Sequence, residues 1–301
     1  MDKCSTVFNY FTQCIRRCFS SMSYTEIETI NEITLISGQP LLVQLNGCRQ
    51  YAGYDGLTAD PGCACVITQK DISIIYEAIT NSSEYAYSRF INEGFITLPF
   101  GHRVGITGNC VVRDDKIINI NHINALSFRL AHSCSNNANL IIDDIIKGQD
   151  VLNTLIISPP GCGKTTLIRG LAELISGSLY GVVRKCAIVD ERYELASCHN
   201  GIASLNVGNS SLIISGCKKS VAIPLVVRSM SPDIIFTDEV SGLDDFEAIK
   251  YAKASGCKII ASVHGSDEKN NELSSQNFAS VFDRIVILNL TSGPGTIAKV
   301  L

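Results

Sequence analysis

The 301-residue sequence has no apolar run approaching the roughly 18 residues that a membrane-spanning helix needs. Charge is also scarce, because Lys, Arg, Asp and Glu make up 18% of the residues whereas the apolar types make up 46%. We therefore expect neither a membrane span nor extended disorder, since the chain can bury a large core. The length is sufficient for two domains of ordinary size.

A basic module and an export signal are lacking as well. The formal net charge is −4, and residues 1–139 carry 10 Lys and Arg against 12 Asp and Glu, so neither half shows the basic footprint of a nucleic-acid-binding domain. Met1–Arg17 has no continuous apolar region followed by a cleavage site, so we expect a cytoplasmic chain.

The 13 cysteines are then expected to be reduced and buried as small apolar residues. Cys14 with Cys18, and Cys63 with Cys65, are alternative metal ligands. Neither pair is followed by a second pair at the spacing of a zinc site, which disfavours that alternative.

The N-terminal residues predict helices and hairpins. Apolar residues at helical spacing predict a helix over 6–22, packed on its own domain or, alternatively, docked on a membrane surface or a partner. Two apolar runs split by Gly38-Gln39-Pro40 predict a hairpin. Residues 46–67 are rich in Gly and Asp and are expected to be loop.

Further along, a helix is expected from a Thr68 cap to Gly94, and antiparallel strands are expected over 94–120. The most polar interruption, "SCSNNAN" (133–139), suggests a domain boundary. We therefore expect a smaller α+β domain over 1–135 and a second domain over 136–301.

The second half has a different pattern. Apolar strands are separated by helical segments or long connections; they are "TLIIS" (154–158), "CAIVD" (186–190), "DIIFTD" (233–238), "KIIASVH" (258–264) and "RIVILNL" (284–290). Buried strands that alternate with helices predict an α/β domain with a mostly parallel sheet covered on both faces.

The stretch "LIISPPGCGKTTLIRG" (155–170) carries a phosphate-binding motif, the Walker A loop. A strand leads into a glycine-containing loop, and a helix is expected over Thr165–Ile175, which is the context that phosphate binding requires. The residues expected to bind ATP are Pro160, Gly161, Cys162, Gly163, Lys164, Thr165 and Thr166. Ser158 stands where the usual motif begins with glycine, which we interpret as a tolerated variation.

Asp238 and Glu239 follow an apolar strand in "SPDIIFTDEV", as in a Walker B motif. Asp238 and the Thr165 hydroxyl are candidate Mg²⁺ ligands, and Glu239 is a candidate general base toward water. An Asp-Glu pair at a strand end can also be a solvated loop, but the phosphate loop in the same chain favours the catalytic interpretation. The strand "CAIVD" lies between the two motifs in the sequence, which indicates the additional-strand class of RecA-like P-loop ATPases.

Two further sets of polar residues follow strands, where ligands bind in open parallel sheets. Asp190, Glu191 and Arg192 follow "CAIVD", and His264 ends "KIIASVH". His264 is a candidate γ-phosphate contact; the alternative is a purely structural hydrogen bond.

Together, "PPGCGKTTLIRGLA", "CAIVDERYELA", "VRSMSPDIIFTDEV" and "IIASVHG" resemble the stage III sporulation protein AA family, relatives of the type II and type IV secretion ATPases. "EITLISGQPL", "GFITLPFGHRVGITGNCVV" and "INALSFRLAH" in the first half agree with it, so the resemblance covers roughly residues 25–300. One departure is Ser241, in Glu239-Val240-Ser241, where the family reads Glu-Ile-Gly.

The resemblance implies catalytic roles for Glu191, Arg192, Glu239 and His264. It also implies a hexameric ring in which arginines act between subunits, with Arg103, Arg129, Arg192 and Arg228 as candidates. The implied function is an ATP-hydrolysing motor in the mother-cell cytoplasm, peripheral to the membrane, that drives assembly of or transport through a channel. The alternatives are a nucleic-acid-associated ATPase, which the lack of a basic stripe disfavours, and a weakly hydrolysing nucleotide-gated scaffold.

Overall fold

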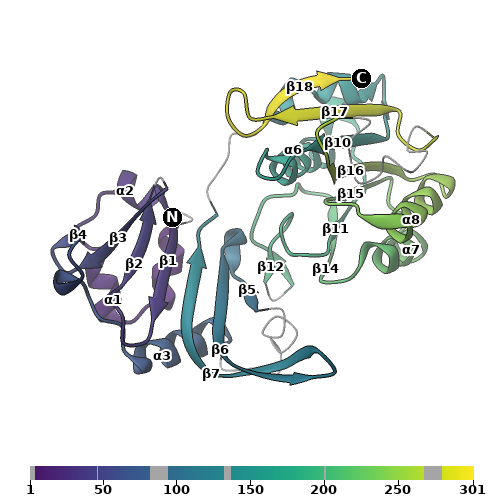
Figure 1. Cartoon of the computed structure of the whole chain (residues 1–301). Helices are drawn as coiled ribbons and strands as arrows, with labels where there is room; N and C mark the ends of the chain where they lie inside the picture. Colours follow the sequence, from purple (N-terminus) through teal and green to yellow (C-terminus); the bar gives the residue numbers. More distant parts are fainter. Residues whose placement is uncertain (1–3, 46, 82–93, 132–136, 200, 268–279) are drawn as a thin grey trace. The chain divides into compact units, whose positions relative to one another are not determined.

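The computed structural model describes residues 4–45, 47–81, 94–131, 137–199, 201–267 and 280–301. The chain divides into two compact units, Met1–His132 and Ser133–Leu301, each built around its own sheet (Figure 1). Within the described ranges, no helix has the length and apolar character needed to cross a membrane.

Unit 1 is an antiparallel seven-stranded sheet with the order β4-β3-β2-β1-β7-β6-β5. Its strands are β1 (Ile30–Ile36), β2 (Leu42–Leu45), β3 (Cys48–Gly53), β4 (Gly56–Thr58), β5 (Phe95–Thr97), β6 (Arg103–Arg113) and β7 (Lys116–Arg129). The expected hairpin is confirmed as β1 and β2, with Ile33 opposite Val43, and the antiparallel strands expected after Gly94 are β5, β6 and β7.

The N-terminal segment is not the single helix expected over 6–22. It forms the 3₁₀ helix η1 (Cys4–Tyr10), α1 (Gln13–Cys18) and α2 (Tyr24–Glu28). The break falls at Thr12, whose backbone is extended and whose hydroxyl donates to Asp71 Oδ1 at 2.7 Å. The apolar residues of the segment still pack into the core of unit 1, where Phe11 lies edge-on against Phe128 with ring centroids 4.9 Å apart. Packing on its own unit is therefore the correct alternative for this segment.

The prediction that residues 46–67 form a loop is wrong. Strands β3 and β4 lie there, followed by the 3₁₀ helix η2 (Pro61–Cys63). Strand β3 is mostly exposed at its start, so its sequence lacks the apolar alternation that identifies a half-buried strand. Gly53 is required in β3, because a Cβ there would lie 2.2 Å from the carbonyl oxygen of Cys63.

Thr68 caps α3 (Gln69–Ile79) as expected, through a reciprocal capping box with Asp71. The rest of the helix expected up to Gly94 lies largely outside the described residues. A 3₁₀ turn, η3 (Pro99–Gly101), connects β5 to β6.

Unit 2 has a seven-stranded sheet with the order β14-β11-β15-β16-β10-β17-β18, parallel except for the edge strand β18. The strands are β10 (Thr154–Ser158), β11 (Cys186–Asp190), β14 (Ser211–Ser215), β15 (Ile234–Thr237), β16 (Lys258–His264), β17 (Arg284–Asn289) and β18 (Thr296–Val300). The smaller elements are η4 (Asn137–Leu140), α5 (Ile142–Ile145), η5 (Leu179–Gly181) and the two short hairpins β8 (Ile146–Lys147) with β9 (Asp150–Val151) and β12 (Cys198–His199) with β13 (Ile202–Ala203).

Helices cover both faces of this sheet, which confirms the α/β class. Alternate residues of β10 point to opposite faces: Ile156 belongs to the core that contains α6 (Lys164–Ser176), and Leu155 and Ile157 belong to the core that contains α7 (Lys219–Met230) and α8 (Gly242–Ala254). The helix expected over Thr165–Ile175 is α6.

The strand that lies between the two nucleotide motifs in the sequence is not the one that lies between them in the sheet. Strand β11, which contains "CAIVD", lies beyond β15, whereas β16 lies between β10 and β15. The register therefore sets His264 opposite Ser158. This order places His264 between the phosphate loop and the Asp238-Glu239 pair.

Candidate active site

The phosphate loop connects β10 to α6 with the geometry that its glycines permit. Gly161 has φ +76° and Gly163 has φ +87°, a left-handed region that favours glycine. A Cβ on Gly163 would also lie 3.0 Å from the backbone nitrogen of Gly295, which itself donates to the Cys162 carbonyl at 2.8 Å. The β17–β18 connection thus packs directly against the loop, a contact that the sequence did not indicate.

Ser158 fits the position where glycine is usual. It is the last residue of β10 and fully buried, and its hydroxyl donates to the Pro159 carbonyl at 2.9 Å. Its own carbonyl accepts a hydrogen bond from Gly265 at 3.2 Å. Since this residue is part of an extended strand, no left-handed backbone is needed there.

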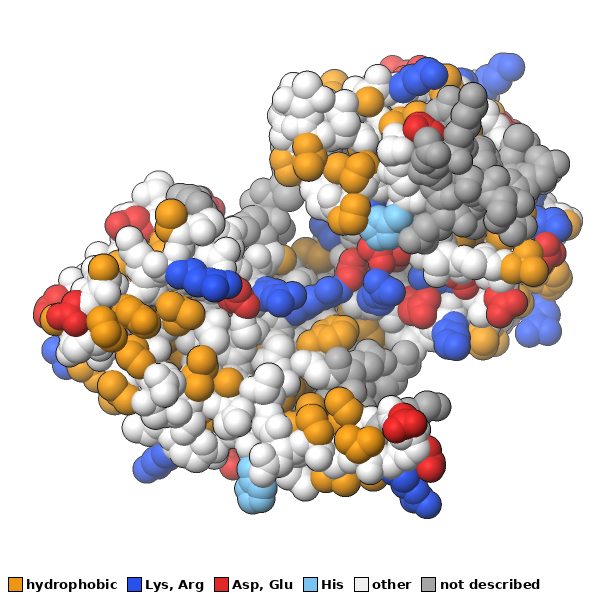
Figure 2. Space-filling view, in the orientation of Figure 1, with side chains coloured by type: hydrophobic (Ala, Val, Ile, Leu, Met, Phe, Trp, Pro, Cys, Tyr) orange, Lys and Arg blue, Asp and Glu red, His pale blue; other side chains and the backbone are white. Residues whose placement is uncertain are grey.

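A continuous set of contacts joins the phosphate loop to the acidic pair. The ammonium of Lys164 lies 3.0 Å from His264 Nδ1, and His264 Nε2 lies 3.1 Å from Glu239 Oε1. The other carboxylate oxygen of Glu239 accepts from Arg192 at 2.6 Å. Four residues singled out from the sequence therefore lie in direct contact. Figure 2 shows acidic and basic side chains beside a histidine on unit 2.

These contacts determine the tautomer of His264. A lysine ammonium can only donate, so Nδ1 accepts from Lys164 and the proton of the neutral ring lies on Nε2, where it donates to Glu239. Lys164 also donates to the carbonyls of Ser158 and Pro159, at 3.1 and 3.2 Å.

Glu239 has an unusual backbone. Its φ is +44°, which is uncommon for a residue with a side chain and costs conformational energy. The neighbouring strand compensates, because the amide of Glu239 donates to the hydroxyl of Ser262 at 3.0 Å and the amide of Val240 donates to the Ser262 carbonyl at 2.8 Å. Ser262 is fully buried in β16 and was missed in the sequence, where it lies within an apolar strand.

Two buried carboxyl groups lie at the carboxyl ends of the neighbouring strands β11 and β15. Asp190 and Asp238 are 0% and 3% exposed. Burial, followed by the charge of Asp190, raises the pKa of Asp238 to about 7, although the charge of Lys219 acts in the opposite direction. Burial also raises the pKa of Asp190, against hydrogen bonds from backbone amides.

Asp190 and Glu191 have different partners. The two oxygens of Asp190 accept from the amides of Glu194 and Ala196, at 2.7 and 2.9 Å, so Asp190 anchors the turn after β11. Arg169 of α6 holds the same turn through the Glu194 and Leu195 carbonyls. Glu191 instead pairs with Lys219 at 2.8 Å. Arg169 and Lys219 were also missed, because neither belongs to a recognisable motif.

The oxygen donors of this region suit Mg²⁺. The hydroxyl of Thr165, at the start of α6, and the carboxylate of Asp238 are the ligands that Mg²⁺ takes in phosphate sites. The raised pKa of Asp238 reflects burial beside a second carboxyl group, and a bound dication would favour its ionised form. Thr165 and Asp238 are therefore the residues that would hold the ion.

The cysteines of the described ranges have varied surroundings. In the described ranges, no group of three or more His, Cys, Asp or Glu residues has the arrangement needed to hold a metal ion. The expectation that the cysteines are buried is only partly correct, because Cys14, Cys48, Cys63 and Cys110 are exposed.

The remaining candidate arginines lie in varied settings. Arg103 lies over the ring of Phe95 at 5.3 Å, Arg129 is 3.6 Å from Glu32, and Arg228 donates to the Pro224 carbonyl. Arg192 contacts Glu239 of the candidate site at 2.6 Å.

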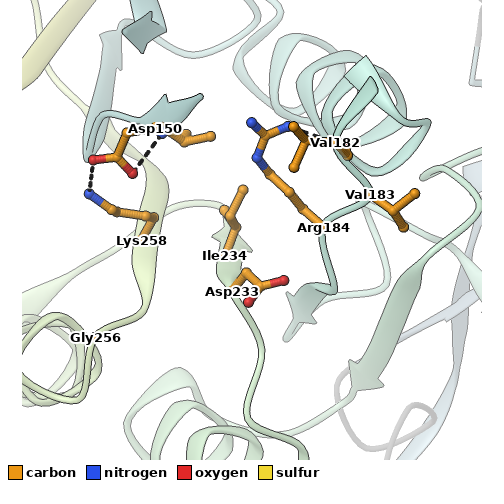
Figure 3. Close-up of a pocket in the computed structure, with 9 residues that line it drawn as sticks. Asp150, Val182, Val183, Arg184, Asp233, Ile234, Gly256 and Lys258 are labelled. Carbon is orange, nitrogen blue, oxygen red and sulfur yellow. Dashed lines mark hydrogen bonds and ion pairs between the residues drawn. The ribbon is translucent and has the colours of Figure 1, made fainter. Parts of the chain in front are cut away.

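A separate pocket of about 370 Å³ lies at the opposite, amino-terminal end of the parallel strands (Figure 3). Val151 and Ile234 line its buried base, and Asp150 pairs with Lys258 at 2.7 Å on its rim. In open parallel sheets, ligands bind at the carboxyl ends of the strands, so we assign the nucleotide chemistry to the other edge.

Solved structures share this fold. The pilus retraction motor PilT with bound ADP is 14% identical with a TM-score of 0.55, and the similarity covers 87% of this chain and 75% of that one. The ATPase DotB of Legionella pneumophila is 14% identical with a TM-score of 0.53, over 88% of this chain and 73% of that one. The fold thus defines the class: a RecA-like P-loop protein built like these ATPases.

The family follows from closer relatives. The family model for sporulation stage III, protein AA matches residues 1–301. Stage III sporulation protein AA of Bacillus subtilis (strain 168) is 31% identical over 276 residues, which cover 90% of this chain and 86% of that protein. The chain belongs to the stage III sporulation protein AA family, as its motifs indicated. The uncharacterized protein ycf45 of Cyanidium caldarium is 27% identical over 129 residues, or 42% of this chain and 37% of that protein.

The raised pKa of Asp238 predicts a pH-dependent stability difference. A carboxyl group with a pKa of about 7 in the fold and an ordinary value of 3.8 takes up a proton on folding between these pH values. The free energy of unfolding therefore falls as the pH rises through this window. Asp238→Asn stays neutral, so we expect it to match the wild type near pH 4 and exceed it at pH 8 by up to about 4 kcal/mol, at about 1.36 kcal/mol per pKa unit.

Urea unfolding at both pH values, in buffer with a chelator, measures this difference. A stability gap that stays constant between pH 4 and pH 8 would contradict the raised pKa.

Proposed function

We propose that this chain is a Mg²⁺-dependent ATPase. The observation that carries the proposal is the contact of Lys164 with His264 and of His264 with Glu239, at 3.0 and 3.1 Å, at the carboxyl edge of a parallel sheet. These contacts connect a phosphate-binding loop to a carboxylate suited to activate water. The family membership and the shared fold with ATPases support the same conclusion.

ATP binding would use the loop and the start of α6. The backbone amides of residues 161–166 would donate to the phosphates beside Pro160, which has no N–H, and the amino end of α6 would add its positive dipole. Lys164 would exchange its carbonyl partners, Ser158 and Pro159, for phosphate oxygens. Mg²⁺ held by Thr165 and Asp238 would supply charge neutralisation at the β- and γ-phosphates.

Hydrolysis would use Glu239 as the group that orients and deprotonates water. Its backbone is fixed by Ser262 and its carboxylate is held by Arg192 and His264. Movement of Lys164 toward phosphate would free His264 Nδ1, and a ring that carries its proton on Nδ1 could then donate a hydrogen bond to the γ-phosphate. Phosphoryl transfer depends mainly on such positioning and charge stabilisation.

The cellular role that we propose is a motor of a secretion-like complex during sporulation, in the mother-cell cytoplasm or at the inner face of the membrane. It would work as a hexameric ring that couples ATP hydrolysis to channel assembly or transport. The family and the likeness to a pilus retraction motor support this role. Light scattering with and without a non-hydrolysable ATP analogue tests the ring: a mass that stays at one chain in both conditions would contradict it.

A nucleotide-gated scaffold that hydrolyses ATP weakly is the second candidate. The observation that favours it is that both oxygens of Glu239 are engaged, one by Arg192 and one by His264. A carboxylate held in this way is a poorer base until one partner leaves. Nucleotide binding without measurable turnover in the wild type would support the scaffold.

Lys164→Ala is expected to weaken ATP binding by about 100-fold or more, because the charge-assisted hydrogen bonds to phosphate are lost. A titration with a fluorescent ATP analogue measures the affinity. Lys185→Ala, which removes an exposed lysine of the same unit, is the matched control and should bind as the wild type does. Equal affinities in the two variants would rule out a phosphate contact for Lys164.

Glu239→Gln is expected to lower kcat for ATP hydrolysis by about 100-fold or more while leaving ATP affinity within a few-fold, since general-base catalysis contributes roughly 10²–10⁴-fold. Phosphate release and nucleotide titration give the two values. The exposed Glu247 provides the control variant, Glu247→Gln. Wild-type turnover in Glu239→Gln would exclude Glu239 as the base.

A further inference from the structure

Lys219 is a buried lysine outside every motif that the sequence indicated. It is the first residue of α7, and its side chain is 4% exposed. The other lysine that the described ranges bury is Lys164 of the phosphate loop. Burying an ammonium is costly unless it is paired, so a lysine in this position requires a partner.

That partner is Glu191. The Lys219 ammonium donates to Glu191 Oε2 at 2.8 Å, and the backbone amide of Lys219 also hydrogen-bonds the Glu191 carboxylate. The carboxylate is therefore held at two points, at the amino end of a twelve-residue helix where the dipole favours negative charge. Although burial opposes it, the hydrogen bond and charge of Lys219 keep the pKa of Glu191 below its usual value.

The pairing of Lys219 with Glu191 lies next to the proposed hydrolytic residues in the sequence. Glu191 follows Asp190 directly at the end of β11 and precedes Arg192, whose guanidinium contacts Glu239 at 2.6 Å. The Asp190 side chain fixes the turn on one side, and Lys219 fixes Glu191. Through this segment, α7 is connected to the carboxylate proposed to activate water.

We propose that Lys219 is a positioning residue of the hydrolytic site, which acts by holding Glu191 and, through the same segment, Arg192 and Glu239. The inference rests on the proposed ATPase function and adds a residue to it. The ammonium of Lys219 donates to Glu191, which lies after β11 and outside the phosphate loop, so we expect its effect to fall on turnover and not on nucleotide affinity.

The test compares kcat, KM and nucleotide affinity in Lys219→Met, Lys219→Arg, Glu191→Gln and the double variant Lys219→Met/Glu191→Gln. We expect Lys219→Met to lower kcat roughly 10- to 100-fold, as misplacement of a catalytic group does, with ATP affinity within about threefold. Lys219→Arg keeps the charge and should recover much of the loss. Lys218→Met, which removes the exposed neighbouring lysine, should behave as the wild type does.

The double variant separates positioning from general stabilisation. If Lys219 acts through Glu191, its removal adds nothing once Glu191 is neutral, so the double variant should have the kcat of Glu191→Gln. A double variant well below Glu191→Gln, or full turnover in Lys219→Met, would overturn the proposal. If Lys219→Met alone does not fold, the double variant Lys219→Gln/Glu191→Gln, in which both side chains are neutral, is compared with Glu191→Gln in the same way. Absence of turnover in the wild type would instead contradict the proposed ATPase function.

Discussion

The contact of His264 with both Lys164 and Glu239 is the interaction on which the candidate site depends. It exists because β16 lies between β10 and β15 in the sheet, with His264 opposite Ser158. Parallel strands end at one edge, so this order brings the phosphate loop, the histidine and the acidic pair together. Displacement of β16 by one residue would turn His264 toward the other face and disconnect Lys164 from Glu239.

The same edge of the sheet concentrates buried carboxyl groups and cations. Asp190 and Asp238 are both buried, and burial raises the pKa of each; the charge of Asp190 raises the pKa of Asp238 further. Each nearby cation has a different partner: Lys164 contacts His264, Arg192 contacts Glu239, and Lys219 contacts Glu191. We infer that a bound dication would complete the charge balance around Asp238, as expected for a Mg²⁺·ATP site.

The sequence predicted unit 2 better than unit 1, for physical reasons. The strands "TLIIS", "CAIVD" and "KIIASVH" are fully or almost fully buried, so their composition alone identifies them. Strand β3 is largely exposed and gave no such signal, and the break at Thr12 depends on a hydrogen bond to the distant Asp71. Likewise, the motif residues of the site could be predicted, whereas Ser262 and Lys219 could not, because their roles arise only when β16 and α7 pack beside β15 and β11.

Phosphate release from ATP by the unmodified chain, with Mg²⁺ and with a chelator, tests the central claim most directly. The account predicts turnover with Mg²⁺ and its loss in the chelator, together with saturation by ATP, since the ion would bind through Thr165 and Asp238. ATP binding without turnover would favour the scaffold. The absence of both binding and turnover would contradict the assignment of a nucleotide site to this sheet edge.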